Sequence, residues 1–219
     1  MESEYKTKNN GKIGAIFDLD GTLIDSTDKL NLDVSNACKK IGIKIEPYEI
    51  KGRDWHELVE SYGKSKDDFN KALDEREPWA ESLKKGRVSI FQDAIPCLNY
   101  LKNQGVRLSL LSKSIPKYTN LKVDYFNLKQ YFENIVVTPF DAPSKRKEAI
   151  DSVKALIPIE KAYFIGDAVG DVTIADDVEK ELGISTKGIY LSRDGKAIPK
   201  EVERYQQIKS LEELSGIIK

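Results

Sequence analysis

The chain has 219 residues, of which 40% are hydrophobic and 32% charged, and 35 basic and 36 acidic side chains give a formal net charge of −1. This composition indicates a folded globular protein, and the balance of charge excludes a general attraction to nucleic acids or anionic membranes. No apolar run is long enough to cross a bilayer, and residues 1–10 lack the apolar region of a secretion signal. We therefore expect a cytoplasmic protein with no membrane or nucleic-acid partner.

Short apolar runs alternate with helical patterns along most of the chain. The first run, residues 12–17, ends at Asp18 and is followed by a turn-forming stretch. Similar runs follow at residues 106–111, 135–137, 162–165 and 188–191. The segments after Asp93, Pro116, Ser144 and Gly170 have helical spacing, and Asp93 is placed to cap the first of them. This alternation predicts an α/β fold, a Rossmann-like parallel sheet with helices on both faces.

Residues 28–87 interrupt the alternation, because they contain helical patterns and no convincing strand. One apolar stripe includes Val34 and Cys38 and is closed by Gly42. Asp54 and Glu57 have the spacing of a capping box at the start of another helix. We expect two domains: a core made of residues 1–27 and 88–219, and an inserted small helical cap of residues 28–87 over the strand ends.

Polar residues follow four of the predicted strands. They are Asp18 and Asp20 after the first strand, then Ser112, then Lys145 at the start of a helix, and finally Asp167 and Asp171. Each has an ordinary explanation when taken alone, such as a turn serine, a solvated lysine or an aspartate in the first turn of a helix. In a parallel sheet, however, functional groups collect outside the carboxyl ends of the strands. We therefore expect these side chains to form one site.

In this order, the set resembles the four motifs of the haloacid dehalogenase superfamily, Asp-x-Asp, Ser/Thr, Lys and Gly-Asp-x-x-x-Asp. The resemblance spans residues 13–191, and residues 17–26 look especially like the phosphoglycolate phosphatase and β-phosphoglucomutase branch, whose members carry a helical cap after the first motif. It implies a magnesium-dependent phosphoric monoester hydrolase, a monomer or homodimer that acts on a small phosphorylated metabolite.

The resemblance also implies roles for the acidic residues. Asp18 would be the nucleophile that becomes phosphorylated. Asp20, kept protonated by acidic neighbours once substrate and metal are bound, would donate a proton to the leaving oxygen and then activate water. Asp18, Asp167 and the main-chain carbonyl of Asp20 would bind Mg²⁺, while Asp171 would bind a metal water or orient Asp167.

Other residues would hold the phosphoryl group. The predicted contacts come from Ser112, Thr22 and the main-chain N–H groups of Leu19, Asp20 and Lys113, with Lys145 offsetting negative charge. The sequence departs from the family pattern at Ser112-Lys113, where many relatives have Thr-Asn, and at Lys145-Arg146-Lys147, where a Lys-Pro pair is usual.

Two assignments and three alternatives stay open at this point. Lys145 is preferred to Lys147 because it lies at the helix boundary. Arg53 falls where relatives carry a specificity loop; it either binds a second anionic group of the substrate or is an exposed arginine beside a helix cap. A phosphomutase would use the same aspartates, and a non-catalytic phosphoester-binding protein would keep the scaffold. A phosphatase acting on nucleic-acid ends is the third open alternative, although no basic, aromatic-studded groove is evident.

Overall fold

The core of the protein is a six-stranded parallel sheet. The structure, a computed structural model, describes residues 11–50, 55–139, 142, 144–193 and 198–218. The strands are arranged in the order β5-β4-β1-β6-β7-β8. Their bounds are Ile13–Phe17 (β1), Arg107–Lys113 (β4), Asn134–Thr138 (β5), Lys161–Gly166 (β6), Ser185–Leu191 (β7) and Gln206–Ile208 (β8). The predicted α/β class is confirmed, and β1 lies between β4 and β6 as the positions of the polar residues require.

The register of the sheet places Asp18 at its carboxyl edge. Phe17, the last residue of β1, pairs with Leu110 on one side and with Ile165 on the other. The N–H of Asp18 then donates to the carbonyl of Ile165 at 2.9 Å. This bond fixes the backbone of Asp18, so its side chain starts from a fixed point at the carboxyl edge of the sheet.

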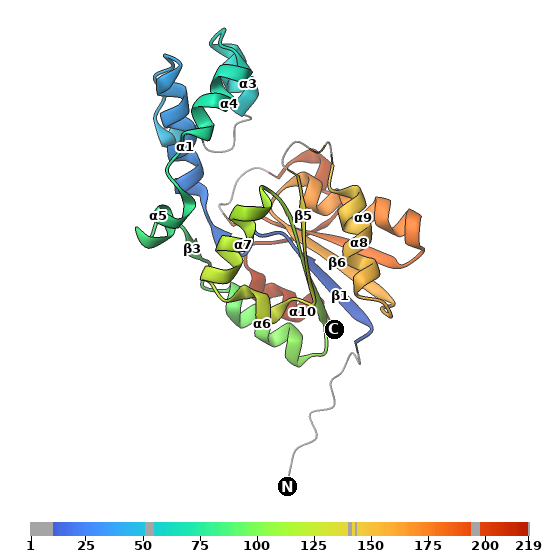
Figure 1. The fold of residues 1–219 in the computed structure, drawn as a ribbon. Helices are drawn as coiled ribbons and strands as arrows, with labels where there is room; N and C mark the ends of the chain where they lie inside the picture. The colour runs from blue at the N-terminus through green and yellow to red at the C-terminus, as the bar shows by residue number, and fades with distance from the viewer. Residues whose placement is uncertain (1–10, 51–54, 140–141, 143, 194–197, 219) are drawn as a thin grey trace. The chain divides into compact units, whose positions relative to one another are not determined.

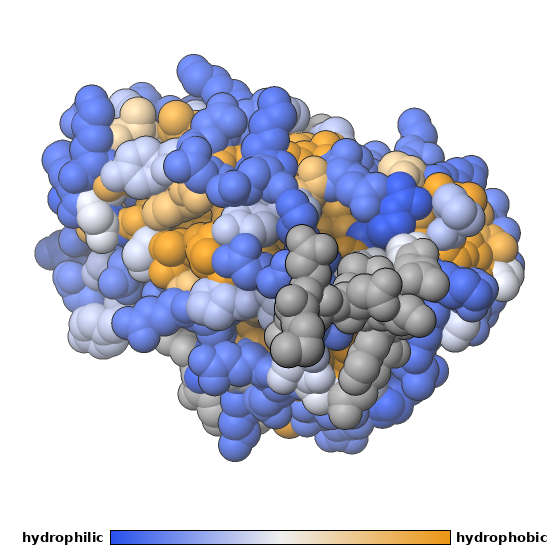
Figure 2. Space-filling view, turned by 90° about the horizontal axis from the view of Figure 1, so that it is seen from below, coloured by the Kyte–Doolittle hydropathy of each residue, from blue (hydrophilic) through white to orange (hydrophobic). Residues whose placement is uncertain are grey.

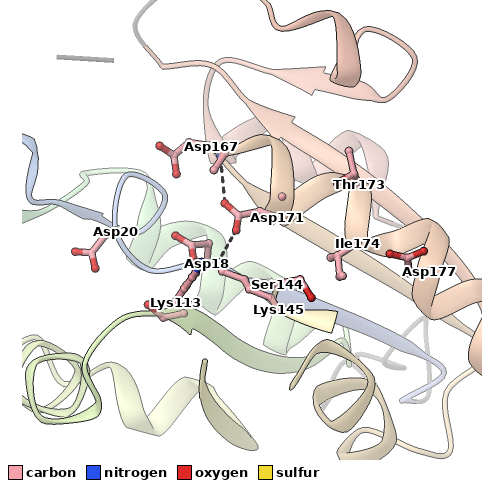
Figure 3. A pocket seen from close by; sticks show the side chains of 13 residues that line it. Asp18, Asp20, Lys113, Ser144, Lys145, Asp167, Asp171, Thr173, Ile174 and Asp177 are labelled. Atoms are coloured by element: carbon pink, nitrogen blue, oxygen red, sulfur yellow. Dashed lines mark hydrogen bonds and ion pairs between the residues drawn. The ribbon is translucent and has the colours of Figure 1, made fainter. Parts of the chain in front are cut away.

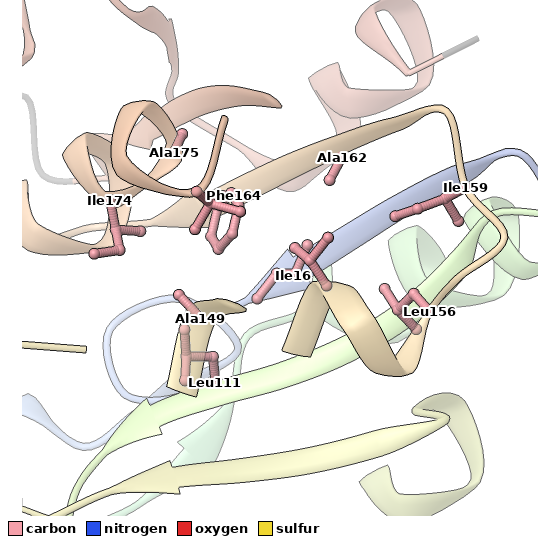
Figure 4. Close-up of a cluster of buried hydrophobic side chains, with 11 residues drawn as sticks. Ile16, Leu111, Ala149, Leu156, Ile159, Ala162, Phe164, Ile174 and Ala175 are labelled. Atoms are coloured by element: carbon pink, nitrogen blue, oxygen red, sulfur yellow. The ribbon is translucent and has the colours of Figure 1, made fainter. Parts of the chain in front are cut away.

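Helices cover both faces of this sheet (Figure 1). The bounds of the core helices are Ala94–Asn103 (α6), Pro116–Tyr125 (α7), Arg146–Ala155 (α8), Val169–Leu182 (α9) and Leu214–Ile217 (α10), with short 3₁₀ turns at Leu128–Tyr131, Lys200–Val202 and Leu211–Glu213. α8 and α9 pack on one face, where Ile16, Leu111 and Phe164 from three strands meet Ala149 and Ala175 (Figure 4). Burial of these side chains supplies the main favourable term in folding.

The chain divides into two compact units, residues 1–24 with 90–219 and residues 25–89. The helices of the second unit are Thr27–Lys40 (α1), Pro47–Ile50 (α2), Trp55–Ser61 (α3), Lys66–Asp74 (α4) and Trp79–Lys84 (α5). They enclose an apolar core of their own that includes Val34, Cys38, Leu58 and Phe69. Two short strands, β2 (Ile24–Asp25) and β3 (Ser89–Ile90), pair where the chain leaves and re-enters the first unit. That the second unit acts as a cap stays a prediction.

The structure differs from the sequence-based expectation at Asp93. This residue precedes α6, but its side chain makes no capping bond. The carboxylate instead accepts from the Arg193 guanidinium at 2.8 and 2.9 Å, from the Ser210 hydroxyl at 2.9 Å and from the Leu211 N–H at 2.9 Å. The Asp93 carboxylate therefore binds residues that are distant in the chain and does not cap α6, although its position in the sequence had predicted a cap.

The surface agrees with the high content of charged residues. Figure 2 shows mostly hydrophilic residues on one face, with hydrophobic side chains visible between them. Both cysteines, Cys38 and Cys97, are buried and free. Within the described part of the chain, no helix combines the length and apolar character needed to cross a membrane.

Candidate active site

Three aspartates meet at the carboxyl edge of the sheet. Asp18 follows β1, Asp167 follows β6, and Asp171 lies in the first turn of α9. One carboxylate oxygen from each lies within 4.8 Å of the others. The side chains thus converge from segments almost 150 positions apart, as expected for residues that follow adjacent parallel strands.

Lys145 supplies the positive charge beside these carboxylates. Its ammonium group donates to Asp18 at 2.6 Å and to Asp171 at 2.5 Å, and its side chain is only 11% exposed. Lys145 lies at the N-cap of α8, whereas Lys147 is exposed within the helix. The structure therefore brings Lys145, rather than Lys147, to the acidic cluster.

The close packing of like charges perturbs the acidic groups. Burial raises the pKa of Asp18 well above 3.8, with repulsion from Asp171 adding to it and Lys145 opposing it. Burial, followed by repulsion from Asp171, raises the pKa of Asp167 from 3.8 to about 6. Burial works against the charged form of Lys145, but Asp18 and Asp171 outweigh it and raise the pKa of this lysine. The cluster therefore lacks positive charge, and a divalent cation would relieve the repulsion.

Two glycines allow the backbone to approach the carboxylates. Gly21 has a φ of +82°, and a Cβ added there would lie 2.2 Å from Oδ2 of Asp167. A Cβ at Gly166 would lie 2.3 Å from the Cβ of Asp171. A larger residue at either position would displace an acidic side chain, and at Gly21 the positive φ would also strain the backbone of any other residue.

Asp20 has a cationic partner that the sequence did not reveal. Its carboxylate Oδ2 accepts from the ammonium group of Lys122 on α7, a lysine whose side chain is fully buried. We expect the acidic neighbours to keep Asp20 protonated once substrate and metal are bound, and that expectation stays a prediction. A lysine within a helix is ordinarily exposed, so no sequence pattern marked this one.

Thr22 has a different contact from the one expected of a phosphate ligand. The residue is fully buried, and its hydroxyl donates to Oδ1 of Asp167 at 3.2 Å. Its carbonyl accepts from the Arg193 guanidinium at 2.7 Å. In this structure the Thr22 hydroxyl thus contacts Asp167, and its role as a phosphate ligand stays a prediction. Arg193, which stacks 3.8 Å over the Phe91 ring, was not identified from the sequence.

An open pocket of about 470 Å³ lies against the acidic cluster. Asp18, Asp20, Ser112, Lys113, Lys145, Asp167 and Asp171 are among its lining residues. Figure 3 shows Asp18 and Asp171 beside Lys145, with Thr173, Ile174 and Asp177 farther along α9. Leu19 is buried, so only its main chain suits a ligand contact. Arg53 lies outside the described residues.

The donor atoms fit a small divalent cation. Asp18 and Asp167 offer carboxylate oxygens, the hard ligands that Mg²⁺ prefers, and few protein ligands are needed because Mg²⁺ keeps several waters. Both oxygens of Asp171 already have partners: Oδ1 accepts from Lys145 and Oδ2 from the N–H of Ala168 at 3.1 Å. Asp171 therefore suits an indirect role, in which it binds a metal water or fixes its neighbours.

Comparison with known proteins agrees with this geometry. The phosphoglycolate phosphatase of Aquifex aeolicus is 28% identical over 173 residues, covering 72% of this chain and 76% of that protein. The phosphoglycolate phosphatase of Nitrosococcus oceani is 25% identical over 177 residues, 73% of this chain and 77% of the relative. The crystal structure of a HAD phosphatase from Thermococcus onnurineus superposes with a TM-score of 0.64 at 22% identity, covering 94% of this chain and 97% of that one. A family model described as haloacid dehalogenase-like hydrolase matches residues 15–186, and the chain therefore belongs to this family.

Proposed function

We propose that the chain is a Mg²⁺-dependent phosphatase that hydrolyses a small phosphate monoester through phosphorylation of Asp18. The observation that carries the proposal is the convergence of Asp18, Asp167 and Asp171 within 4.8 Å, with Lys145 bonded to two of them. A phosphate monoester is a dianion, so an attacking carboxylate requires nearby positive charge. Bound Mg²⁺ would neutralise charge on the nucleophile and on the phosphoryl oxygens.

The residues of the chain divide the reaction between them. A carboxylate oxygen of Asp18 attacks phosphorus, the bond to the leaving oxygen breaks, and Asp20 supplies the proton that this oxygen takes up. In the second step Asp20 removes a proton from water, the water oxygen attacks phosphorus, and the bond to Asp18 breaks. Ser112 and Lys113 line the same pocket, where the Ser112 hydroxyl and the main-chain N–H of Lys113 would hold phosphoryl oxygens and Lys145 would offset their charge.

The substrate class rests on the relatives rather than on the pocket. Two of them are named phosphoglycolate phosphatases, at 28% and 25% identity, which favours a small metabolite phosphate. Residues 28–87 would form the cap and select the substrate, and Arg53 would bind a second anionic group if one is present. The core residues would then act on any phosphate monoester that reaches them.

Hydrolysis of p-nitrophenyl phosphate with and without Mg²⁺ tests the activity. The expected result is turnover that EDTA abolishes and Mg²⁺ restores, with inorganic phosphate released in equal amount. Asp18→Asn should be inactive, and Asp151→Asn, which changes an exposed aspartate on α8, should match the wild type. Beryllium fluoride should form its adduct on Asp18. An adduct on another residue, or full activity of Asp18→Asn, would refute the proposed mechanism.

A further inference from the structure

Lys122 is a fully buried lysine that the proposed chemistry leaves without a role. It lies on α7, its side chain is 0% exposed, and its ammonium group contacts Oδ2 of Asp20. Thr119 and Val123, on the same helix, are also buried. The position is therefore one where an apolar side chain would be expected, and a charged group requires an explanation.

Stability does not explain the charge. Removing an ammonium group from water costs several kcal/mol, and its attraction to a carboxylate often does no more than offset that penalty. Replacing such a pair with apolar residues is frequently neutral or stabilising. Asp20, moreover, is 25% exposed and lines the pocket, so solvent screens its side of the pair. A functional reason for Lys122 is therefore favoured over a structural one.

The backbone of Asp20 is already fixed. Asp20 forms an isolated β-bridge with Ile24, and Gly21 follows it at a φ of +82°. What the backbone does not fix is the direction of the carboxylate, which depends on two side-chain torsions. A cation bonded to Oδ2 restricts both torsions and so sets where the other oxygen is held.

We propose that Lys122 is a positioning residue, which holds the carboxyl group of Asp20 in the orientation that proton transfer requires. Lys122 does not line the pocket, so it acts through Asp20 and not on the substrate. The inference rests on the proposed function. It predicts that loss of Lys122 harms the reaction in the manner of a loss of Asp20.

The leaving group distinguishes this role from a structural one. Nitrophenolate leaves readily without a proton, whereas the alkoxide of an alkyl phosphate such as 2-phosphoglycolate needs one. Asp20→Asn and Lys122→Met should therefore both lower the single-turnover rate of phosphoryl transfer more for 2-phosphoglycolate than for p-nitrophenyl phosphate, with a difference of roughly 10- to 100-fold. A defect in folding alone would reduce both rates by the same factor.

A double-mutant cycle completes the test. Lys122→Met should cause little further loss in the Asp20→Asn background, because it acts through that residue. Lys122→Arg keeps the charge and should recover part of the selectivity for the alkyl phosphate. The control is Thr119→Val, at a buried position one turn earlier on α7, which should leave the ratio of the two rates unchanged.

Equal losses on the two substrates, or additive effects of Asp20→Asn and Lys122→Met, would overturn the proposal. A variant that loses activity only in proportion to its folded fraction, measured by circular dichroism, would assign Lys122 to the fold and overturn it as well. If instead the wild type hydrolyses neither substrate and forms no adduct at Asp18, the proposed function itself fails.

Discussion

Replacing Asp167 with asparagine removes one negative charge from the acidic cluster and keeps an acceptor for the Thr22 hydroxyl. Burial and repulsion by Asp171 raise the pKa of Asp167 from 3.8 to about 6. Between these two values the folded protein binds more protons than the unfolded chain, so its stability falls as pH rises through this window. Above about pH 6 the full penalty of the ionised carboxylate remains.

The expected change in the free energy of unfolding follows from the pKa shift of Asp167. A change of about 2 pKa units corresponds to on the order of 3 kcal/mol. Asp167 is only half-buried, so solvent screening reduces the expected gain in Asp167→Asn to roughly 1–2 kcal/mol at pH 8. For a chain of this length that stabilisation raises the melting temperature by roughly 2–8 °C.

Thermal unfolding in EDTA at pH 4 and pH 8 measures the stabilisation of Asp167→Asn relative to the wild type. Asp167→Asn should melt above the wild type at pH 8 and close to it at pH 4. Mg²⁺ added in excess of EDTA should stabilise the wild type at pH 8 but have little effect on the variant, which lacks a proposed ligand of the cation. Asp151→Asn, an exposed substitution on α8, serves as control. If Asp167→Asn were less stable than the wild type in EDTA at pH 8, the ionised Asp167 would not destabilise the folded protein and the reasoning would be refuted.

Three further substitutions test the other parts of the site. Lys145→Met should lower kcat on p-nitrophenyl phosphate by about 10²- to 10³-fold, whereas Lys147→Met, at an exposed position, should leave it unchanged; the reverse order would reassign the lysine. Ser112→Ala should lower kcat/KM for p-nitrophenyl phosphate and 2-phosphoglycolate by similar factors, since both present the same phosphoryl oxygens. Arg53→Ala should lower kcat/KM for 2-phosphoglycolate by the equivalent of about 1.5–3 kcal/mol and spare p-nitrophenyl phosphate. Equal losses on the two substrates would make Arg53 structural.

Most of the sheet could be predicted because its strands are apolar runs that end in chemically distinctive residues. Asp18 and Asp167 meet because β1 and β6 are neighbours, and neighbouring parallel strands end at the same edge. β8 was missed because its three residues, Gln206–Ile208, are short and mostly polar, with no periodicity to detect.

Long-range polar contacts were the part that the sequence did not reveal. Lys122 reaches Asp20 across 102 positions, and Arg193 reaches Thr22 across 171. In the local sequence each is an ordinary basic residue. The spacing of residues in a helix or strand does not indicate a partner more than 100 positions away. Such pairs become visible only when packing sets which buried faces meet.

The pairing of β2 with β3 brings together the two points at which the chain passes from one unit to the other. Because residues 24–25 lie beside residues 89–90, the chain leaves the core and returns to it at nearly one point. For the folding of the sheet, the inserted unit is therefore equivalent to a long loop whose ends lie close together. The entropic cost of closing a loop grows only slowly with its length. A unit attached in this way can be enlarged, shortened or exchanged by recombination while β1, β4 and β6 keep their register. The core that carries the acidic cluster can thus stay constant in evolution while the inserted unit diverges.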